Sequence, residues 1–441
     1  MKKRITHILF WSVISAAFIG PGTITTAAAA GAEFGYSLVW ALVFSTIACI
    51  ILQEASARLT LASGKNLGQA LKTYLTDSLF GRITLWMIVV GIILGCAAYE
   101  AGNILGAVAG TGLVFDIPPY LMTMGIGVVA FILFWFGSVE SVAKVMGMIV
   151  AFMGICFVIT AIILKPDVGA LIQNIALPGF PNGSNTLILA LIGTTVVPYN
   201  LFLGSGIAKA QEIREMRFSL SVAIGLGGFI SIAVLLVGTA ITGSFSFEAL
   251  AQTLATQLGS WASLLLGLGL FAAGLTSSVT APLAAAVTAK SVFADASGRN
   301  PNWQENGKYY RAVWITVLLA GLGFGVSGVQ PVPAIILAQA LNGIILPLVA
   351  IGLLIIVNNY QLMSAKSMNT LFINIIMSVV VFITIVIGVR NVASAFSNAL
   401  PVQLVHETYI FVASLVIAVL ISWPVYRAIQ KMRNPEYQLG S

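Results

Sequence analysis

The chain has 441 residues, of which 59% are hydrophobic and only 8% are charged. This composition excludes a soluble globular protein, and repeated apolar runs of about 18 or more residues indicate a helical protein with many membrane spans. The net charge of +7 could suggest a nucleic-acid partner, but the placement of the basic residues argues against one.

Twelve membrane spans are predicted, each a largely apolar run. They cover residues 8–31, 37–59, 82–110, 118–136, 144–164, 186–207, 218–242, 259–289, 311–328, 333–357, 370–389 and 408–427. With the N-terminus in the cytoplasm, only Lys165 and Arg390 of the 21 Lys and Arg residues fall on the outer side. This bias predicts a multi-pass protein of the cell inner (plasma) membrane, lying in the lipid bilayer with a cytoplasmic N-terminus.

The N-terminus also fits a second template. Lys2-Lys3-Arg4, the apolar run that follows and the small residues Ala27–Ala30 resemble a cleaved secretory signal. Cleavage would leave an odd number of spans and a weaker charge bias, so an uncleaved first span is favoured.

Two of the spans are interrupted. The first carries Gly20-Pro21-Gly22-Thr23 in its middle, and the sixth carries Gly193–Asn200 around Pro198. Proline lacks an N–H and crowds the preceding turn, and irregular backbone at membrane depth survives only beside protein or a water-filled cavity. Each break therefore indicates a binding site.

Five spans separate the two breaks, so the two halves of the chain are predicted to have opposite orientations. Matching broken helices in inverted repeats predict an all-α integral membrane protein with a LeuT-type fold and a midplane site. Residues 1–164 would form the first repeat (spans one to five), 165–357 the second (spans six to ten), and 358–441 two extra spans and a tail.

Several polar features lie inside or beside the spans. Glu100 lies deep in the third span, where a carboxyl group is functional by default, although Asn103 could satisfy it as a structural acid. Glu54 and Arg58 are four residues apart at the end of the second span and can pair. The predicted connections include an amphipathic segment at 64–75 and an irregular outer loop at 165–185.

Hydroxyl and amide groups mark two later spans. Thr276, Ser277, Ser278 and Thr280 form a cluster in the eighth, where hydroxyls more often bond carbonyls four residues earlier than line a pathway. In the tenth, the amides of Gln339 and Asn342 share a face that points into the bundle.

Motifs for catalysis are missing from the sequence. There is no GxxxxGK[ST], no HExxH and no usable cluster of His or Cys ligands, and the three cysteines show no paired spacing. The chain is therefore predicted not to be an enzyme and to use no cofactor and no bound metal. We expect a monomer whose partners are an ion or a small-molecule substrate.

The broken spans resemble the Nramp family of proton-coupled divalent-metal transporters (natural resistance-associated macrophage proteins). The resemblance rests on Gly20-Pro21-Gly22-Thr23 with Gly31–Trp40, on Leu52–Leu67, on Glu100-Ala101-Gly102, and on stretches of spans six, eight and ten. It covers spans one to ten and implies an alternating-access symporter, with Glu100 as the family's third-span acid.

The departures from the family pattern fall on its metal ligands. Gly20 and Thr23 stand where the family has the aspartate and asparagine of its DPGN motif, and Val197 stands in place of its methionine. Ala97 and Tyr199 replace an acid and a histidine. Mn²⁺ and Fe²⁺ need carboxylate, imidazole or thioether donors, whereas Mg²⁺ often keeps several waters.

Three functions follow from this pattern. The favoured one is a symporter for a small organic solute with a carboxylate, held at an electropositive half-helix start near residues 24–31. The alternative is a divergent divalent-metal transporter, with hydrated Mg²⁺ ahead of Mn²⁺. The third is a sensor that binds without transport.

The predicted substrate-binding residues lie at the two breaks and in the tenth span. They are Gly20, Gly22, Thr23, Thr26, Thr194, Val197, Tyr199, Asn200, Gln339 and Asn342. Glu100 is predicted to be the proton-coupling acid, with H⁺ as the coupling ion and Na⁺ as the alternative.

Overall fold

The computed structural model describes residues 19–76, 78–136, 139–208, 212–294, 300–399 and 407–434, and every regular element in these ranges is helical. The helices are α2 (Pro21–Phe34), α3 (Val39–Ser63), α4 (Leu67–Leu75), α5 (Leu79–Gly112), α6 (Pro119–Phe136), α7 (Val139–Ile163), α8 (Val168–Ala176), α9 (Asn185–Thr195), α10 (Pro198–Ile207), α11 (Ile213–Gly238), α12 (Phe247–Leu258), α13 (Trp261–Phe293), η1 (Pro301–Trp303), α14 (Lys308–Val326), α15 (Pro331–Ile356), α16 (Leu371–Ala399) and α17 (Glu407–Arg433).

Most of the twelve predicted spans are long apolar helices. Among the described residues, nine helices are long and apolar enough to cross a membrane, and a bent pair formed by Gly147–Ile163 and Val168–Ala176 would add a tenth. The fourth predicted span is a shorter apolar helix, Pro119–Trp135. The first is described only from Ile19 onward, so its earlier part lies outside the described residues.

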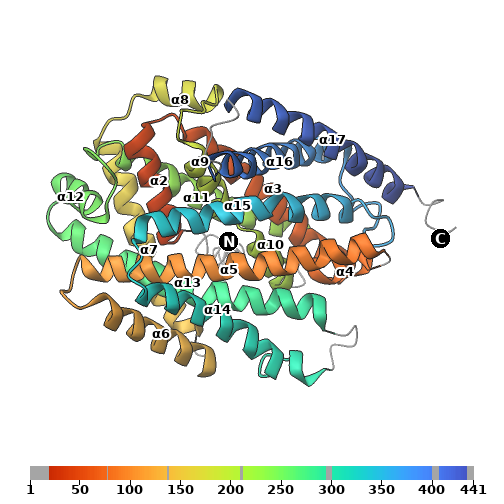
Figure 1. Ribbon diagram of the computed structural model, residues 1–441, viewed down its shortest axis with the longest axis horizontal. Coiled ribbons are helices and arrows are strands. Elements are labelled where there is room, and N and C mark those ends of the chain that lie inside the picture. Colours follow the sequence, from red (N-terminus) through yellow and green to blue (C-terminus); the bar gives the residue numbers. More distant parts are fainter. Residues whose placement is uncertain are drawn as a thin grey trace.

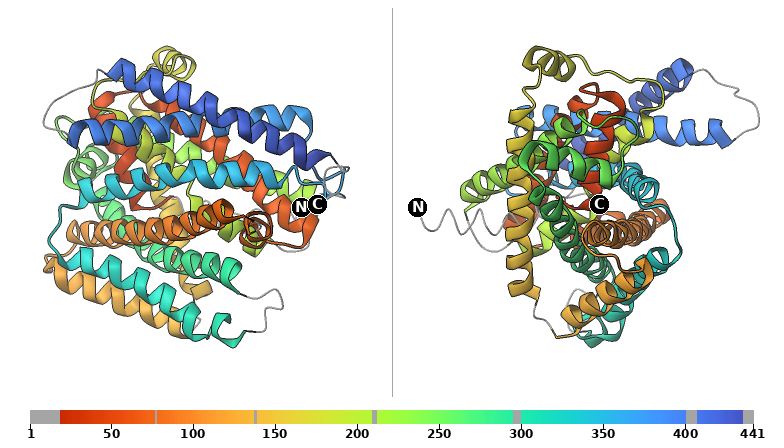
Figure 2. Two further views of the ribbon diagram at one scale, coloured as in Figure 1. Left: turned by 45° about the vertical axis from the view of Figure 1, so that its right-hand side comes forward. Right: turned by 90° about the vertical axis from the view of Figure 1, so that its left-hand side faces the viewer.

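The long helices form a bundle whose ends carry the short helices. Figure 1 shows α12 at the left end of the bundle, α8 at the top left of centre, and α4 at the right end. These are the connections that the charge bias predicts on opposite sides of the membrane. Helix α5 packs against α13, α14 and α15 near the middle, and α16 and α17 lie together along one side (Figures 1 and 2).

Small residues let the central helices approach closely, as in other membrane bundles. A Cβ added at Gly274 of α13 would lie 2.5 Å from the Ala107 Cβ of α5. A Cβ added at Gly238 of α11 would overlap the Ala28 carbonyl oxygen of α2. The second of these contacts holds α2, which belongs to the broken first span, against the unbroken helix α11.

The broken sixth span is confirmed. Helix α9 ends at Thr195 and α10 begins at Pro198, so Val196 and Val197 form the interruption. In the first span, α2 begins at Pro21, directly after an extended Gly20. This start is three residues earlier than the predicted half-helix 24–31, because proline is accommodated at the first helical position, where no N–H is needed.

Two predicted boundaries are wrong. The stretch 165–185 is not wholly irregular, since Asp167 accepts a 3.1 Å hydrogen bond from the Ala170 N–H and caps α8. The eleventh span does not stop at 389 either: α16 continues to Ala399, which places Arg390 within a helix and 6% exposed. The connector at 64–75 does contain a helix, α4, which Asn66 and Gln69 cap reciprocally.

The predicted Glu54–Arg58 pair forms and belongs to a larger cluster. Arg58 Nε donates to Glu54 Oε1 at 2.8 Å, and Arg217 Nε of α11 donates to the same oxygen at 2.7 Å. The Arg58 guanidinium also reaches the Ser367 carbonyl oxygen and Asn369 Oδ1. The cluster therefore joins α3 to α11 and to the segment between α15 and α16.

Candidate functional site

The two half-helices begin in the same way. Helix α2 starts at Pro21 after Gly20, and α10 starts at Pro198 after Val197, and neither start has a side chain that caps its N–H groups. Both breaks are buried, with Val197 1% exposed. The first N–H groups of α2 and α10 therefore carry partial positive charge. Helix α9 ends at the sixth-span break, and its last carbonyls carry partial negative charge.

A hydroxyl pair joins the two breaks directly. Thr23 Oγ1 of α2 lies 2.8 Å from Thr194 Oγ1 of α9, and the two residues are 171 positions apart in the chain. Both side chains are buried. The sequence prediction that the two breaks meet is thus confirmed for this pair.

Gln339 of α15 lies against both breaks. A Cβ added at Gly22 of α2 would overlap the Gln339 amide nitrogen, and one added at Gly193 of α9 would overlap the Gln339 carbonyl oxygen. Glycine at these two positions is what allows α15 to approach. The Gln339 amide is fully buried, and neither of its polar atoms has a hydrogen-bond partner.

Glu100 of α5 is a fully buried carboxyl group at the centre of the bundle. One oxygen accepts a long 3.5 Å hydrogen bond from Asn103 Nδ2, while the other oxygen has no partner. The Ser278 hydroxyl of α13 neighbours the carboxyl group, and Gly321 of α14 leaves room for it, since a Cβ there would lie 2.5 Å from Glu100 Cγ. Among the described residues no Lys, Arg or His forms an ion pair with it.

Tyr199 brings the sixth-span break against Tyr99, the residue that precedes Glu100 in α5. Its ring lies edge-on to that of Tyr99, with centroids 5.4 Å apart and an interplanar angle of 90°. Both phenols are buried, neither hydroxyl has a hydrogen-bond partner, and Glu100 lies close enough to Tyr199 to interact with it electrostatically.

Ser277 and Ser278 extend the site onto α13. Thr276 and Thr280 donate to carbonyls four residues earlier, as predicted for this cluster, but the two serine hydroxyls have no partner. Ser277 Oγ would lie 3.2 Å from a Cβ on Gly20, and Ser278 neighbours Glu100. Their type was visible in the sequence, but only helix rotation decides which hydroxyls face the breaks.

Three predicted site residues make further contacts. Thr26 donates to the Gly22 carbonyl oxygen at 2.8 Å, so its hydroxyl is used within α2. Asn342 faces α5, where its Oδ1 would lie 2.7 Å from a Cβ on Gly95. Asn200 accepts at its backbone carbonyl from Gln53 Nε2 of α3 at 3.2 Å, and its side-chain amide is buried without a partner.

Unpartnered polar atoms are thus concentrated around the breaks. Those of the site are Tyr99 OH, Glu100 Oε1, Asn103 Oδ1, Tyr199 OH, both atoms of the Asn200 amide, the Ser277 and Ser278 hydroxyls, and both atoms of the Gln339 amide. Buried polar groups are normally hydrogen-bonded, because an unmet group costs about 1–3 kcal/mol. The cluster therefore suits a polar ligand or ordered water.

The chemistry of the donor set is restricted. Among the described residues, no group of three or more His, Cys, Asp or Glu side chains could hold a metal ion. The site can offer one carboxylate, several hydroxyls and amides, and the backbone carbonyls at the end of α9.

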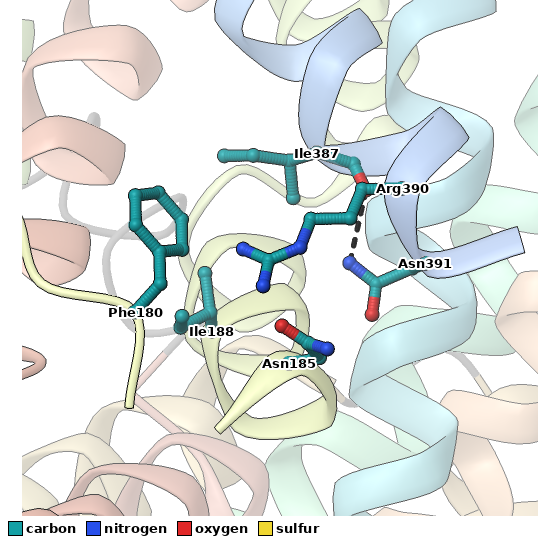
Figure 3. Close-up of a pocket in the computed structure, with 6 residues that line it drawn as sticks. All are labelled: Phe180, Asn185, Ile188, Ile387, Arg390 and Asn391. Atoms are coloured by element: carbon teal, nitrogen blue, oxygen red, sulfur yellow. Dashed lines mark hydrogen bonds between the residues drawn. The ribbon is translucent and has the colours of Figure 1, made fainter. Parts of the chain in front are cut away.

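A small pocket of about 10 Å³, with room for about one water molecule, lies elsewhere, at the start of α9 (Figure 3). Its lining residues are Phe180, Asn185, Ile188, Ile387, Arg390 and Asn391. The Arg390 guanidinium lies over the Phe180 ring, 4.8 Å from its centroid, and the Asn391 amide bonds back to the Ile387 carbonyl oxygen at 2.9 Å. None of these residues belongs to the breaks, so this cavity is separate from the candidate site.

A family model matches residues 12–394, nearly the whole chain, and is described as natural resistance-associated macrophage protein-like (Nramp). Curated relatives include a "Divalent metal cation transporter MntH" of Yersinia pestis, 25% identical over 370 residues, which cover 80% of this chain and 86% of the relative. A protein of the same name from Klebsiella pneumoniae is 25% identical over 389 residues, covering 85% and 90%.

Solved structures agree on the fold. The manganese transporter of Eremococcus coleocola superposes with a TM-score of 0.71 at 17% identity, covering 97% of this chain and 94% of that one. Mhp1, a nucleobase-cation-symport-1 family transporter, gives a TM-score of 0.57 at 15% identity, covering 96% and 92%. The predicted all-helical, LeuT-type fold is therefore confirmed.

The comparisons bear unequally on the predicted functions. They support a membrane transporter, and they give no support to the favoured organic, carboxylate-bearing solute. The relatives named for divalent metal cations favour the alternative prediction instead.

Proposed function

Because the chain belongs to the Nramp family, we propose that it is a secondary active transporter for a divalent cation that keeps much of its water, with Mg²⁺ the favoured ion. The curated relatives named as divalent metal cation transporters support the charge of the cargo. The donor set at the breaks supports its hydration.

The observation that carries this proposal is the state of Glu100. Its carboxyl group is fully buried, one oxygen has no partner, and among the described residues no basic side chain pairs with it. A buried carboxylate without a countercharge is very unfavourable, so the group must hold a proton or face a bound cation. Exchange between these two states would couple proton movement to cation movement.

Hydration of the cargo follows from the lack of further acids. In the part of the chain that the structure describes, Glu100 is the one acid assigned to the site, so Mn²⁺ would miss the carboxylate, imidazole and thioether donors that it needs. Mg²⁺ is commonly held by one or two carboxylates while it keeps several waters. The unpartnered Gln339 amide, the Tyr199 hydroxyl and the Ser278 hydroxyl could bond such waters.

A small organic anion is the second candidate. It is favoured by the two half-helix starts at Pro21 and Pro198, whose N–H groups have no side-chain cap. The hydroxyls of Thr23 and Thr194 lie at the same place. A carboxylate would match these donors, but it would leave the second oxygen of Glu100 without an explanation.

Uptake into proteoliposomes tests the proposal. Purified protein is reconstituted with an Mg²⁺ indicator or a pH indicator inside, and Mg²⁺, Mn²⁺ or small monocarboxylates are added outside. We expect Mg²⁺ influx accompanied by acidification. Accumulation of a monocarboxylate without any divalent-ion flux would overturn the proposal in favour of the second candidate.

Two variants test whether Glu100 is the residue that carries the coupled proton. Glu100→Gln keeps the size of the side chain but cannot exchange a proton, so we expect acidification to disappear and Mg²⁺ flux to fall to background. Glu33→Gln is the matched control, because Glu33 is exposed at the far end of α2. If Mg²⁺ influx in Glu100→Gln still acidifies the vesicles, another group carries the coupled proton. If neither protein acidifies the vesicles, the next measurement is whether a Na⁺ gradient drives Mg²⁺ uptake.

A further inference from the structure

The face of α5 that carries Glu100 continues one turn toward the start of the helix, to Cys96. Tyr99, Glu100 and Asn103 follow Cys96 by three, four and seven residues, which is the spacing of one helix face. All four side chains are at most 1% exposed. Tyr99, Glu100 and Asn103 each carry an oxygen atom without a hydrogen-bond partner. Cys96 is therefore the fourth member of a buried face whose other members already belong to the candidate site.

Helix geometry and the neighbouring helix bring the Cys96 thiol toward the other groups. Side chains of an α-helix tilt toward its N-terminus, so the Glu100 carboxyl group leans over the turn that carries Cys96. The thiol is close enough to Glu100, and to Tyr199 of α10, to interact with both electrostatically. A thiol, a carboxyl group and a phenol are thus gathered where α5, which runs through the middle of the bundle, meets the sixth-span break (Figure 1).

These three groups have bonding capacity that the fold does not use. Glu100 Oε1 and the Tyr199 hydroxyl have no hydrogen-bond partner, and the Cys96 thiol is free and fully buried. Carboxylate oxygens suit hard ions such as Mg²⁺, whereas thiolate sulfur selects softer ions such as Zn²⁺ and the still softer Cd²⁺. A thiol beside the acid therefore widens the range of divalent ions that the site can hold, without helping it to hold Mg²⁺.

We propose that Cys96 and Glu100 form a subsite for a thiophilic divalent cation, Zn²⁺ or Cd²⁺, with the Tyr199 hydroxyl and water in the remaining coordination positions. When the ion binds, a sulfur–metal bond forms and the thiol proton leaves to water, and a protonated Glu100 releases its proton in the same way. The inference rests on the proposed function in one respect, since the thiophilic ion and Mg²⁺ would compete for Glu100. A thiophilic ion should therefore block Mg²⁺ uptake.

Ultraviolet absorption of the whole purified protein, titrated with Cd²⁺, tests the role of the thiol. A sulfur–cadmium bond gives a charge-transfer band, whereas Mg²⁺ gives none. We expect a saturable band in the wild type and its loss in Cys96→Ser. The double variant Cys49→Ser with Cys156→Ser keeps Cys96 as the only cysteine and should retain the band. Thermal unfolding midpoints of the variants exclude unfolding as the cause of a lost band.

Cys49 of α3 and Cys156 of α7 are matched controls for Cys96. Both are buried, but no acid lies three or four places from either one along its helix. A band that persists in Cys96→Ser, or that disappears in the double variant, would overturn the proposal.

Glu100→Gln tests whether the thiol acts together with the acid. This variant keeps the thiol and removes the carboxylate, so Cd²⁺ binding should weaken by about tenfold or more. An unchanged affinity would show a thiol that binds alone, which would contradict the subsite.

Competition in proteoliposomes separates this inference from the proposed function. Cd²⁺ should inhibit Mg²⁺ uptake by the wild type, and Cys96→Ser should raise the Cd²⁺ concentration for half inhibition by about tenfold or more. Equal inhibition of the two proteins would count against the subsite. A Cd²⁺ band at Cys96 in a protein that takes up no Mg²⁺ would refute the proposed function and leave the subsite intact, whereas Mg²⁺ uptake without the band would refute the subsite alone.

Discussion

Gly20 stands, by the resemblance drawn from the sequence, where the Nramp family has the aspartate of its DPGN motif. A Cβ there would lie 3.2 Å from Ser277 Oγ, which is tight but falls on a small side chain and not on backbone. The position opens α2 and lies next to a helix start that favours negative charge. The site therefore lacks this carboxylate because the residue is glycine, and the surrounding backbone leaves room for an aspartate side chain at this position.

Restoring that carboxylate gives a direct prediction. Gly20→Asp places a carboxylate at the first break, next to the Ser277 hydroxyl, so Mn²⁺ binding should strengthen by about tenfold or more, or about 1.4 kcal/mol. Isothermal titration calorimetry with Mn²⁺ measures the change. Gly20→Asn, of the same size but neutral, is the control, and equal affinities in the two variants would contradict the argument.

The sequence predicted those residues of the site whose effect depends on the chain nearby, and not those whose role depends on how the helices pack. Pro21 and Pro198 interrupt helices wherever they lie, so the sequence alone located both breaks. Glu100 was identifiable because an acid at membrane depth is rare. The roles of Ser277 and Ser278 were not, because hydroxyl residues one position apart face different directions and only packing decides which face the breaks.

At the scale of elements, the start of α2 is held by a glycine of its neighbour. A Cβ added at Gly106 of α5 would overlap the Cβ of Pro21, whose ring cannot rotate away. The close contact of α2 with α5 therefore depends on Gly106. It also sets the distance between the first break and Glu100, which lies on α5.

Gly106→Ala should accordingly destabilise the protein by about 1–3 kcal/mol through overpacking and should reduce Mg²⁺ uptake. Gly112→Ala, in the same helix with no atom within 4 Å of the added Cβ, is the control and should be neutral or stabilising. Unfolding midpoints in detergent and proteoliposome uptake measure both effects. Equal midpoints for the two variants would show that Pro21 can yield.

A second prediction at this scale concerns Glu54. The carboxylate bridges Arg58, whose side chain is 1% exposed, and Arg217, whose side chain is 47% exposed. Glu54→Gln would leave Arg58 buried without a countercharge, at a cost of roughly 3–5 kcal/mol. Arg217→Gln removes only the exposed partner and should cost little.

Thermal unfolding of the two variants separates these effects. A large drop in the midpoint for Glu54→Gln and a small one for Arg217→Gln is the expected result. If the two variants lose the same stability, the network is held by Arg217 and not by the buried pair. The sequence showed the Glu54–Arg58 pair because it is local, but Arg217 joins it from 163 residues away.

At the scale of the molecule, the hydropathy pattern located most of the spans, while connections were harder to predict. Helix α8 was missed because its proline- and glycine-rich flanks resemble a loop, and its cap on Asp167 is a single hydrogen bond. Helix α16 continues beyond Arg390. The Arg390 guanidinium lies over the rings of Phe180 and Phe411, 4.8 and 5.7 Å from their centroids, and these contacts help to accommodate a buried charge in the helix.

The orientation of the bundle remains a prediction from the charge bias, which places both ends of the chain in the cytoplasm of the cell. Lys165 and Lys366 are exposed residues in connections predicted to lie on opposite sides of the membrane. The three native cysteines are buried, so they should not react with a thiol reagent in the folded protein. Labelling of a cysteine introduced in place of either lysine should therefore be measurable without a background signal from the native cysteines.

Labelling of intact cells with a membrane-impermeant maleimide measures this orientation. Lys165→Cys, just before α8, should be labelled in intact cells, whereas Lys366→Cys, between α15 and α16, should be labelled only after permeabilisation. The positive-inside rule gives the sign of the result, because Lys165 is one of only two basic residues on its side. The reverse labelling pattern would invert the bundle relative to this prediction.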